Sequence, residues 1–430
     1  LAYRNYFKFA HLEKLRHPLL VILFTVFVDL LGFGILIPVI PLLLADPASS
    51  FYLLPKSFNI SQGFILLGLL TAVFPIGQFI ATPILGQLSD KFGRKRILAI
   101  SLLGTCISYL IFALGIYTRN IPLLFFSRFF DGITGGNISV AMASIADITF
   151  PQNRAKNFGL MGAAFGIGFI IGPFVGGKLS DPGIISWFNA TTPFLFAAIL
   201  SFLNIMSVLL FFPETLKIRK HQLKIEWTKS LNNILHAYSF EKLRVLFLSN
   251  FLFQAGFSFF VTFFAVFLIT KFNFNQGNIG DFFAYVGVWI AFTQIVLTRR
   301  LGAKYTDYKI LRISFFGCAI MVFAYLLPSS VWQFLLIVPF FAAFNGLAQA
   351  NSSALVSKSV DKTIQGEVLG VNASIQALAQ SIPPVLSGFI AAKLSPEAPI
   401  FVASGVMLLA AVIFFLFYKP VTHVLHQTSA

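Results

Sequence analysis

Charged residues are the scarcest class in this chain of 430 residues. Asp, Glu, Lys and Arg together make up 11% of it, whereas globular soluble domains carry about 25%. Hydrophobic residues make up 57%, and the mean hydropathy is +0.85. This composition excludes an ordinary soluble domain and predicts an all-α integral membrane protein, because a polypeptide crosses a bilayer most readily as apolar helices.

Cysteine is almost absent. Cys106 and Cys318 both lie inside long apolar runs and form no CxxC or other metal-binding spacing. We therefore predict no disulfide, no metal site and no cofactor. The ends of the apolar runs also lack a nucleophile–base set, so an enzyme is excluded, and nothing resembles a ligand-sensing domain or a pore filter.

Twelve runs of roughly 20 apolar residues, each long enough to cross a bilayer, recur along the chain. The first is too long for a cleavable signal peptide and lacks a small-residue cleavage site. The expected spans are 18–44, 62–88, 96–117, 121–147, 156–179, 191–212, 243–269, 281–301, 309–327, 331–356, 365–392 and 399–418.

The formal net charge of +16 reflects topology rather than nucleic-acid binding. Of the 31 Lys and Arg residues, 25 fall in alternate loops and at the termini, and five fall in the intervening loops, at Lys56, Arg119, Lys178, Lys271 and Lys393. Basic residues concentrate on the cytoplasmic side of membrane proteins. We therefore expect both termini in the cytoplasm, and a bacterial cytoplasmic (inner) membrane as the location.

The twelve spans divide into two halves of six. Residues 1–212 and 242–430 are predicted to form two pseudo-symmetric six-helix bundles, joined by a basic linker at 213–241. Ile97-Leu98 recurs as Ile310-Leu311 at an offset of 213, and Gly177 recurs as Gly388 at an offset of 211. The linker is compatible with an amphipathic helix on the inner leaflet or with a plain tether.

The sequence Gly-Gln-Leu-Ser-Asp-Lys-Phe-Gly-Arg-Lys-Arg separates the second and third spans. Asp90 precedes Arg94 by four residues, so the two can pair on one helical turn, while Gly86 allows a close helix approach and Gly93 a tight turn. The segment resembles the loop signature of the major facilitator superfamily. The corresponding loop of the second half, 299–309, lacks the Asp and both glycines at the equivalent positions (offset 213), and only the first half keeps the full motif.

The fourth span adds charged residues to this picture. Arg128 and Asp131 lie at i and i+3, and their spacing before Gly132 resembles the family's fourth-helix signature; a purely structural ion pair is the alternative. Asp147, at the end of the same span, resembles the family's acidic partner for Arg94. The resemblance implies a charge network that latches the outward-open state.

The fifth span is rich in glycine, which lets helices pack backbone to backbone, while Pro173 bends the helix. Its Gly-x-x-x-Gly-Pro-x-x-Gly-Gly pattern resembles the signature of major facilitator exporters that work as substrate/proton antiporters. The alternative is a tightly packed helix of any transporter. The residues concerned are Gly162, Gly168, Gly172, Pro173, Gly176 and Gly177.

Titratable groups inside the bilayer are few. All six histidines lie in the termini or the linker, which leaves Asp29 and Asp131 to exchange protons. Asp29 lies about 16 Å into the first span at 1.5 Å per residue, in a stretch that resembles the first helix of tetracycline-resistance-like exporters. Asp131 has Arg128 beside it and is expected to stay ionised, so Asp29 is the first candidate for the proton carrier; a carboxylate fixed by hydrogen bonds is the alternative.

No charged residue lies deep in spans 7 to 12, and these spans offer amides instead. Together with two from the first half they are candidates for hydrogen bonds to a substrate between the halves, although amides also bridge helices. The candidates are Gln78, Asn137, Gln254, Gln294, Asn345, Gln349, Asn372, Gln376 and Gln380.

The resemblance covers nearly the whole chain and implies a secondary active transporter. We expect proton-coupled efflux of small lipophilic or amphipathic molecules by a monomer through alternating access. The second half lacks the deep acidic or histidine residue of tetracycline exporters, so tetracycline itself is in doubt as a substrate. A carrier that imports or exports a specific metabolite or siderophore is the alternative.

Overall fold

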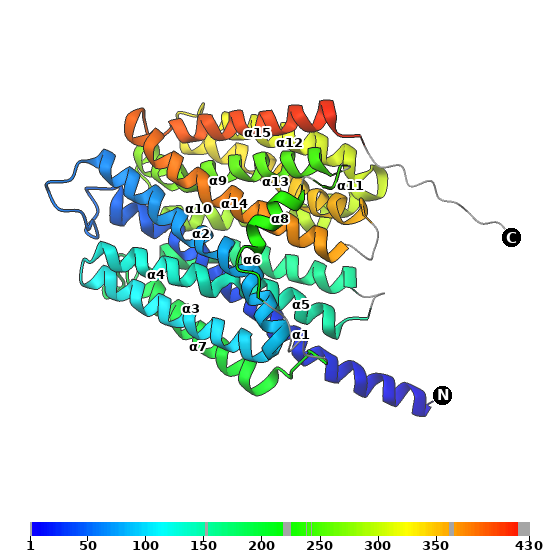
Figure 1. Cartoon of the computed structure of the whole chain (residues 1–430). Coiled ribbons are helices and arrows are strands. Elements are labelled where there is room, and N and C mark those ends of the chain that lie inside the picture. The colour runs from blue at the N-terminus through cyan, green and yellow to red at the C-terminus, as the bar shows by residue number, and fades with distance from the viewer. Residues whose placement is uncertain are drawn as a thin grey trace.

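The computed structural model describes residues 2–150, 154–217, 225–237, 239–241, 243–360 and 365–419, and its regular structure over these residues is helical. The helices run side by side in two groups (Figure 1). The first half contains α1 (Ala2–Leu44), α2 (Ile60–Phe92), α3 (Arg94–Tyr117), α4 (Ile121–Thr134), α5 (Ile138–Ile148), α6 (Arg154–Leu179) and α7 (Thr192–Phe211).

The second half begins with α9 and ends with α15, and a short helix, α8 (Lys229–Ala237), precedes it. In Figure 1, α8 lies across the boundary between the two groups. The helices of this half are α9 (Arg244–Phe272), α10 (Gln276–Phe292), α11 (Thr298–Lys304), α12 (Asp307–Ala324), α13 (Val331–Lys358), α14 (Gln365–Lys393) and α15 (Ala398–Phe417).

Ten helical stretches among the described residues are long and apolar enough to cross a membrane. The two remaining predicted spans depart from that pattern for local reasons. The fourth is divided into α4 and α5 by a 3-10 turn at Gly135–Asn137, and the ninth, α12, has three charged residues among its first six. The fourth covers its predicted range and α12 ends at Ala324, three residues before the predicted end, so all twelve predicted spans correspond to helical segments.

Helix starts repeat between the halves. The Asn59 side chain accepts a hydrogen bond from the Gln62 backbone at the start of α2, and Gln62 bonds back to the Asn59 backbone. Asn275 and Asn278 form the same capping box at the start of α10, which corresponds to α2 in the second half. The paired caps satisfy backbone groups that would otherwise lack partners, and they support the two-fold internal repeat.

Aromatic packing forms the core of the second half. Phe264, Phe267, Phe334 and Tyr325 are fully buried and contact one another with ring centroids 5.0 to 6.2 Å apart. The first half is held by a separate apolar cluster that contains Phe112 and Phe194. Most core residues of each half thus belong to one cluster, although the first-half cluster also includes Phe263, Val266 and Ala391 of the second half.

The two ends of the bundle are named by the chain termini. The terminal face is the side at which α1 begins and α15 ends (Figure 1), and the other side is the opposite face. Because the spans alternate in direction, the α2–α3 junction lies at the terminal face, and the loop 45–59 lies at the opposite face.

Candidate functional site

A buried ion pair lies within α4. Arg128 Nη1 donates a hydrogen bond to Asp131 Oδ2 at 2.7 Å, and the two residues are only 4% and 3% exposed. The guanidinium carbon also lies 4.4 Å from the centroid of the Phe74 ring on α2. Both partners of this predicted pair are therefore withdrawn from solvent, where a charge is stable only with such compensation.

Asp29 lies beside this pair but is not bonded to it. Its Oδ2 is buried and has no hydrogen-bond partner among the described residues. The Asn137 side chain and the Asp131 carboxyl are the groups that interact electrostatically with the Asp29 carboxyl. The sequence placed no charged residue within a helical turn of Asp29, but the fold brings a second acid to it from α4.

The break between α4 and α5 shapes this site. Gly136 lies against the α2 backbone, where an added Cβ would be 2.9 Å from the Thr82 nitrogen. Gln78 Nε2 donates to the Gly135 carbonyl at 3.2 Å. The Asn137 side chain, which the sequence had assigned to substrate, lies at the end of this turn, and both of its polar atoms are buried without a hydrogen-bond partner among the described residues. Gln78 therefore supports the turn in this conformation.

Tyr109 and Thr105 on α3 complete the site, and sequence reasoning missed both. Tyr109 is 4% exposed, and its hydroxyl interacts electrostatically with Asp131, Asp29 and Arg128. The Thr105 hydroxyl shares a hydrogen bond with the Thr134 hydroxyl at 3.2 Å, and Thr134 donates to the Asp131 backbone carbonyl at 3.3 Å. The i, i+4 spacing of Thr105 and Tyr109, which places both on one face of α3, was the available signal. We call Asp29, Tyr109, Arg128, Asp131 and Asn137 the polar cluster.

The predicted charge network at the terminal face is present. Arg94 lies 2.6 Å from Asp90 Oδ1 through Nη1 and 3.1 Å from Asp147 Oδ2 through Nε. Its backbone N–H donates to Glu214 Oε1 at 2.9 Å. Gly93 adopts a φ of 105° at the turn, a conformation that glycine adopts readily. At Gly86, an added Cβ would be in ordinary contact with Ser139, at 3.5 Å.

An ion pair also lies at the terminal face in the second half, where the loop motif is incomplete. Lys358 Nζ lies 2.5 Å from Asp307 Oδ2. Asp307 stands 213 residues after Arg94 and Lys358 stands 211 residues after Asp147, so the repeat offsets already present in the sequence were the signal. The two halves therefore place an ion pair at the same ends of equivalent helices, with the charges exchanged.

Most of the glycines of α6 form close contacts. Cβ atoms added at Gly168, Gly172 and Gly176 would each lie 2.6 Å from a carbonyl oxygen of α1. Pro173 lies inside α6, and its Cδ lies close to Gly34 of α1. A Cβ added at Gly162 would have no described atom within 4 Å. The expected small-residue packing is therefore present along α6 from Gly168 onward.

The two halves meet at the opposite face. An added Cβ at Gly177 would lie 2.4 Å from the Gln276 carbonyl of α10, and one at Gly68 would lie 2.3 Å from the Pro384 carbonyl of α14. Towards the terminal face, an added Cβ at Gly162 of α6 or Gly370 of α14 would meet no described atom within 4 Å. This conformation is therefore closed at the opposite face.

The amides of the second half form a ladder between helices. Gln254 of α9 and Gln349 of α13 exchange two hydrogen bonds, at 3.0 and 3.4 Å. Asn250 Nδ2, which sequence reasoning missed, donates to Asn372 Oδ1 at 3.5 Å and its Oδ1 accepts from the Ser352 hydroxyl at 2.8 Å. These amides bridge helices in this conformation.

Other predicted amides form fewer hydrogen bonds to the rest of the protein. Asn345 Oδ1 is buried without a partner among the described residues, and Gln294 donates to the Gly346 carbonyl at 3.3 Å from a π-helical turn, Thr293–Leu297. Such turns are frequent at functional sites. Gln376 and Gln380 on α14 are half-buried.

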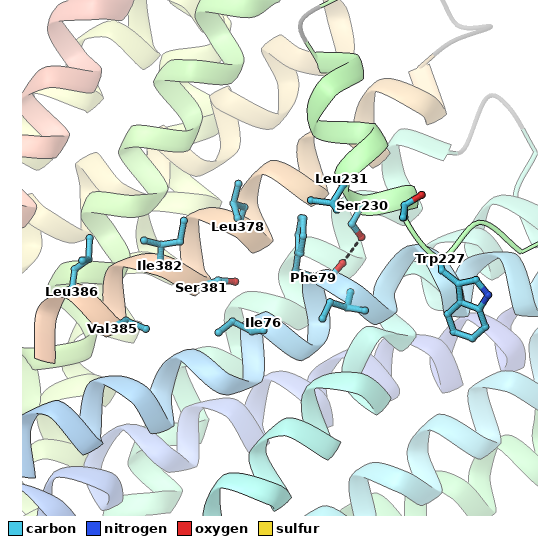
Figure 2. A pocket seen from close by; sticks show the side chains of 12 residues that line it. Ile76, Phe79, Trp227, Ser230, Leu231, Leu378, Ser381, Ile382, Val385 and Leu386 are labelled. Carbon is cyan, nitrogen blue, oxygen red and sulfur yellow. Dashed lines mark hydrogen bonds between the residues drawn. The ribbon is translucent and has the colours of Figure 1, made fainter.

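The helix α8 connects the halves near the terminal face. The Ser230 hydroxyl donates to the Phe79 carbonyl of α2, and Asn233 Nδ2 donates to the Ser374 hydroxyl of α14 at 3.1 Å. Beside it, a groove of about 500 Å³ lies between α2 and α14 (Figure 2). Its walls are mainly apolar, so the groove suits hydrocarbon rather than polar ligands.

Comparison with known proteins agrees with this architecture. The model of the Major Facilitator Superfamily matches residues 22–329 and 246–429. The chain is 32% identical to the class H tetracycline resistance protein of Pasteurella multocida, covering 86% of this chain and 88% of that one. It is 30% identical to multidrug resistance protein 2 of Bacillus subtilis (strain 168), over the same shares.

Solved structures show the same fold at lower sequence identity. The D-xylose-proton symporter superimposes with a TM-score of 0.75 at 19% identity, covering 94% of this chain and 98% of that one. The family match, the two relatives and the paired bundles agree, and the chain belongs to the major facilitator superfamily.

Proposed function

We propose that this protein is a proton-coupled exporter of small lipophilic or amphipathic molecules that works by alternating access. The observation that carries the proposal is the Asp29 carboxyl, which lies mid-span without a hydrogen bond to Oδ2 among the described residues and beside the Arg128–Asp131 pair. A carboxyl in such surroundings exchanges a proton more readily than one fixed by an ion pair. The resistance proteins to which the chain is similar support the direction of transport.

In this proposal the two halves have different roles. The first half carries the polar cluster and couples transport to protons. The second half has an amide ladder, whose side chains suit binding of an amphipathic molecule through hydrogen bonds beside apolar contact. The π-helical turn at Gln294 and the buried Asn345 oxygen are the points at which the substrate contacts this half.

The terminal face is the cytoplasmic face in this proposal. The distribution of Lys and Arg supports that orientation in a bacterial inner membrane, with both termini inside the cell and a monomer as the working unit. A conformation that is closed at the opposite face is then closed towards the outside of the cell. The Arg94 network is already formed in it and joins elements of the first half, so its role as a latch of the outward-open state needs an added contact with the second half once the terminal face closes.

The test is transport by the purified protein in proteoliposomes. Tetracycline and a fluorescent lipophilic cation are offered outside vesicles whose lumen is acidic. An antiporter accumulates the probe in the lumen as protons leave, and the accumulation collapses when an ionophore removes the pH gradient. Accumulation that ignores the gradient would contradict proton coupling.

A thermal shift screen with the same preparation tests the substrate class. Weak stabilisation by many lipophilic compounds is expected, because binding by apolar contact discriminates little. Strong stabilisation by a single metabolite or siderophore, with none by lipophilic compounds, would identify a specific carrier and overturn the exporter proposal.

A further inference from the structure

Tyr109 is a buried titratable member of the polar cluster whose own part in proton coupling the proposed function does not specify. It belongs to α3, and its hydroxyl reaches the backbone of α1. A Cβ added at Gly32 would lie 1.7 Å from the Tyr109 hydroxyl oxygen and 2.5 Å from the carbon that bears it. Gly32 therefore leaves the space that this hydroxyl occupies, one helical turn after Asp29.

The hydroxyl is surrounded by the charged groups of the first half. The charges that act on it are those of Asp29 on α1, Arg128 and Asp131 on α4, and Cys106 on its own helix. Tyr109 is thus within electrostatic range of both deep acids. Three residues of helix rise separate Gly32 from Asp29, about 4.5 Å along the axis.

We propose that the Tyr109 hydroxyl is a proton-relay group between Asp29 and Asp131. In the step, the protonated Asp29 carboxyl gives its proton to the Tyr109 oxygen, directly or through one water, while Tyr109 gives its own proton to the Asp131 carboxylate. Tyr109 ends neutral, Asp29 ends ionised, and the proton has moved from α1 to α4. This relay rests on the proposed function, because it requires a transporter that moves protons.

A relay differs from a packing role in one testable respect. Tyr109→Phe keeps the ring that fills the space beside Gly32 and removes the oxygen that transfers the proton. Tyr325 offers a matched control in the second half, since it is also fully buried and its hydroxyl has no hydrogen-bond partner among the described residues. The groups that interact electrostatically with the Tyr325 hydroxyl are Cys318 and Tyr285, and neither has a carboxyl group.

The experiment compares wild type, Tyr109→Phe and Tyr325→Phe in proteoliposomes, with ethidium as the probe. Two rates are measured for each: accumulation driven by an acidic lumen, and exchange of labelled for unlabelled ethidium without a pH gradient. We expect Tyr109→Phe to lower the rate of driven accumulation at least about tenfold. Groups that transfer a proton typically contribute about 10²–10⁴-fold to a rate. Exchange should persist, and Tyr325→Phe should behave as wild type in both assays.

The remaining outcomes separate the two proposals. If wild type does not respond to the pH gradient, the proposed function fails and the relay fails with it. If wild type responds and Tyr109→Phe responds equally at every pH, the hydroxyl carries no proton. If Tyr109→Phe loses driven accumulation and exchange to the same extent, the hydroxyl is structural, and the relay is likewise overturned.

Discussion

Lys178 Nζ and Asp281 Oδ2 lie 2.8 Å apart at the opposite face, and they join the two halves of the molecule. Lys178 is the last-turn residue of α6, and Asp281 lies in the second turn of α10. Among the ion pairs of the described residues, this one spans the halves. It closes the face at which Gly177 contacts the Gln276 carbonyl.

Neutralising this pair should favour opening of the opposite face. Both side chains are partly exposed, and such pairs contribute about 0.2–1 kcal/mol. Asp281→Asn should therefore raise the outward-open fraction up to ~5-fold, measured as the distance between spin labels on the loops of α6 and α10. The exchanged variant Lys178→Asp/Asp281→Lys serves as the control and should restore the wild-type distribution. An unchanged distribution in Asp281→Asn would remove the pair from the gate.

The glycines of α6 should differ sharply in their tolerance of a methyl group. Gly172→Ala places a Cβ 2.6 Å from the Leu31 carbonyl of α1, and overpacking of this kind costs about 1–3 kcal/mol. Gly162→Ala meets no atom within 4 Å in this conformation and is the matched control. Thermal unfolding in detergent should show a lower midpoint for Gly172→Ala and little change for Gly162→Ala. Equal midpoints would argue against close packing of α1 and α6.

The Arg94 network should affect transport more than expression. Asp90→Asn removes the 2.6 Å partner of Arg94 while Asp147 remains, so the first half should still fold. We expect the variant to favour the inward-open state and to lower the transport rate. Asp307→Asn provides the comparison, because it breaks the corresponding pair with Lys358 in the second half. Normal transport by Asp90→Asn would refute the latch.

The proposed orientation predicts which positions react from outside the cell. Cysteines introduced at Lys56 and Lys271 should react with a membrane-impermeant thiol reagent in intact cells. A cysteine at Lys229, at the start of α8, should react only after permeabilisation. Labelling at position 229 in intact cells would reverse the orientation.

Much of the fold was predictable because membrane crossing leaves a long-range signal in the sequence. Runs of apolar residues indicated the twelve spans, and the repeat offsets indicated the two halves. The break at Gly135–Asn137 was not predicted, because its reason lies in another helix: Gly136 yields space to the backbone of α2 at Thr82. Periodicity within one span carries no information about such a contact.

Part of the candidate site was also predictable, because some of its contacts join residues that are close in sequence. Arg128–Asp131 and Asp90–Arg94 are local pairs at i, i+3 and i, i+4, which sequence spacing reveals. The approach of Asp131 to Asp29 and the insertion of the Tyr109 hydroxyl beside Gly32 depend on how α1, α3 and α4 pack. The amides of α9 and α13 pair with each other, which composition alone did not indicate.

The most direct test of proton coupling is driven transport by Asp29→Asn in proteoliposomes with an acidic lumen. Asparagine imitates the permanently protonated carboxyl at nearly the same volume, so accumulation against a gradient should vanish while substrate exchange survives. Asp131→Asn should weaken both, because it leaves Arg128 buried without its partner, a cost of about 3–5 kcal/mol. If Asp29→Asn accumulates the probe as wild type does, Asp29 is structural, and proton coupling through its carboxyl is refuted.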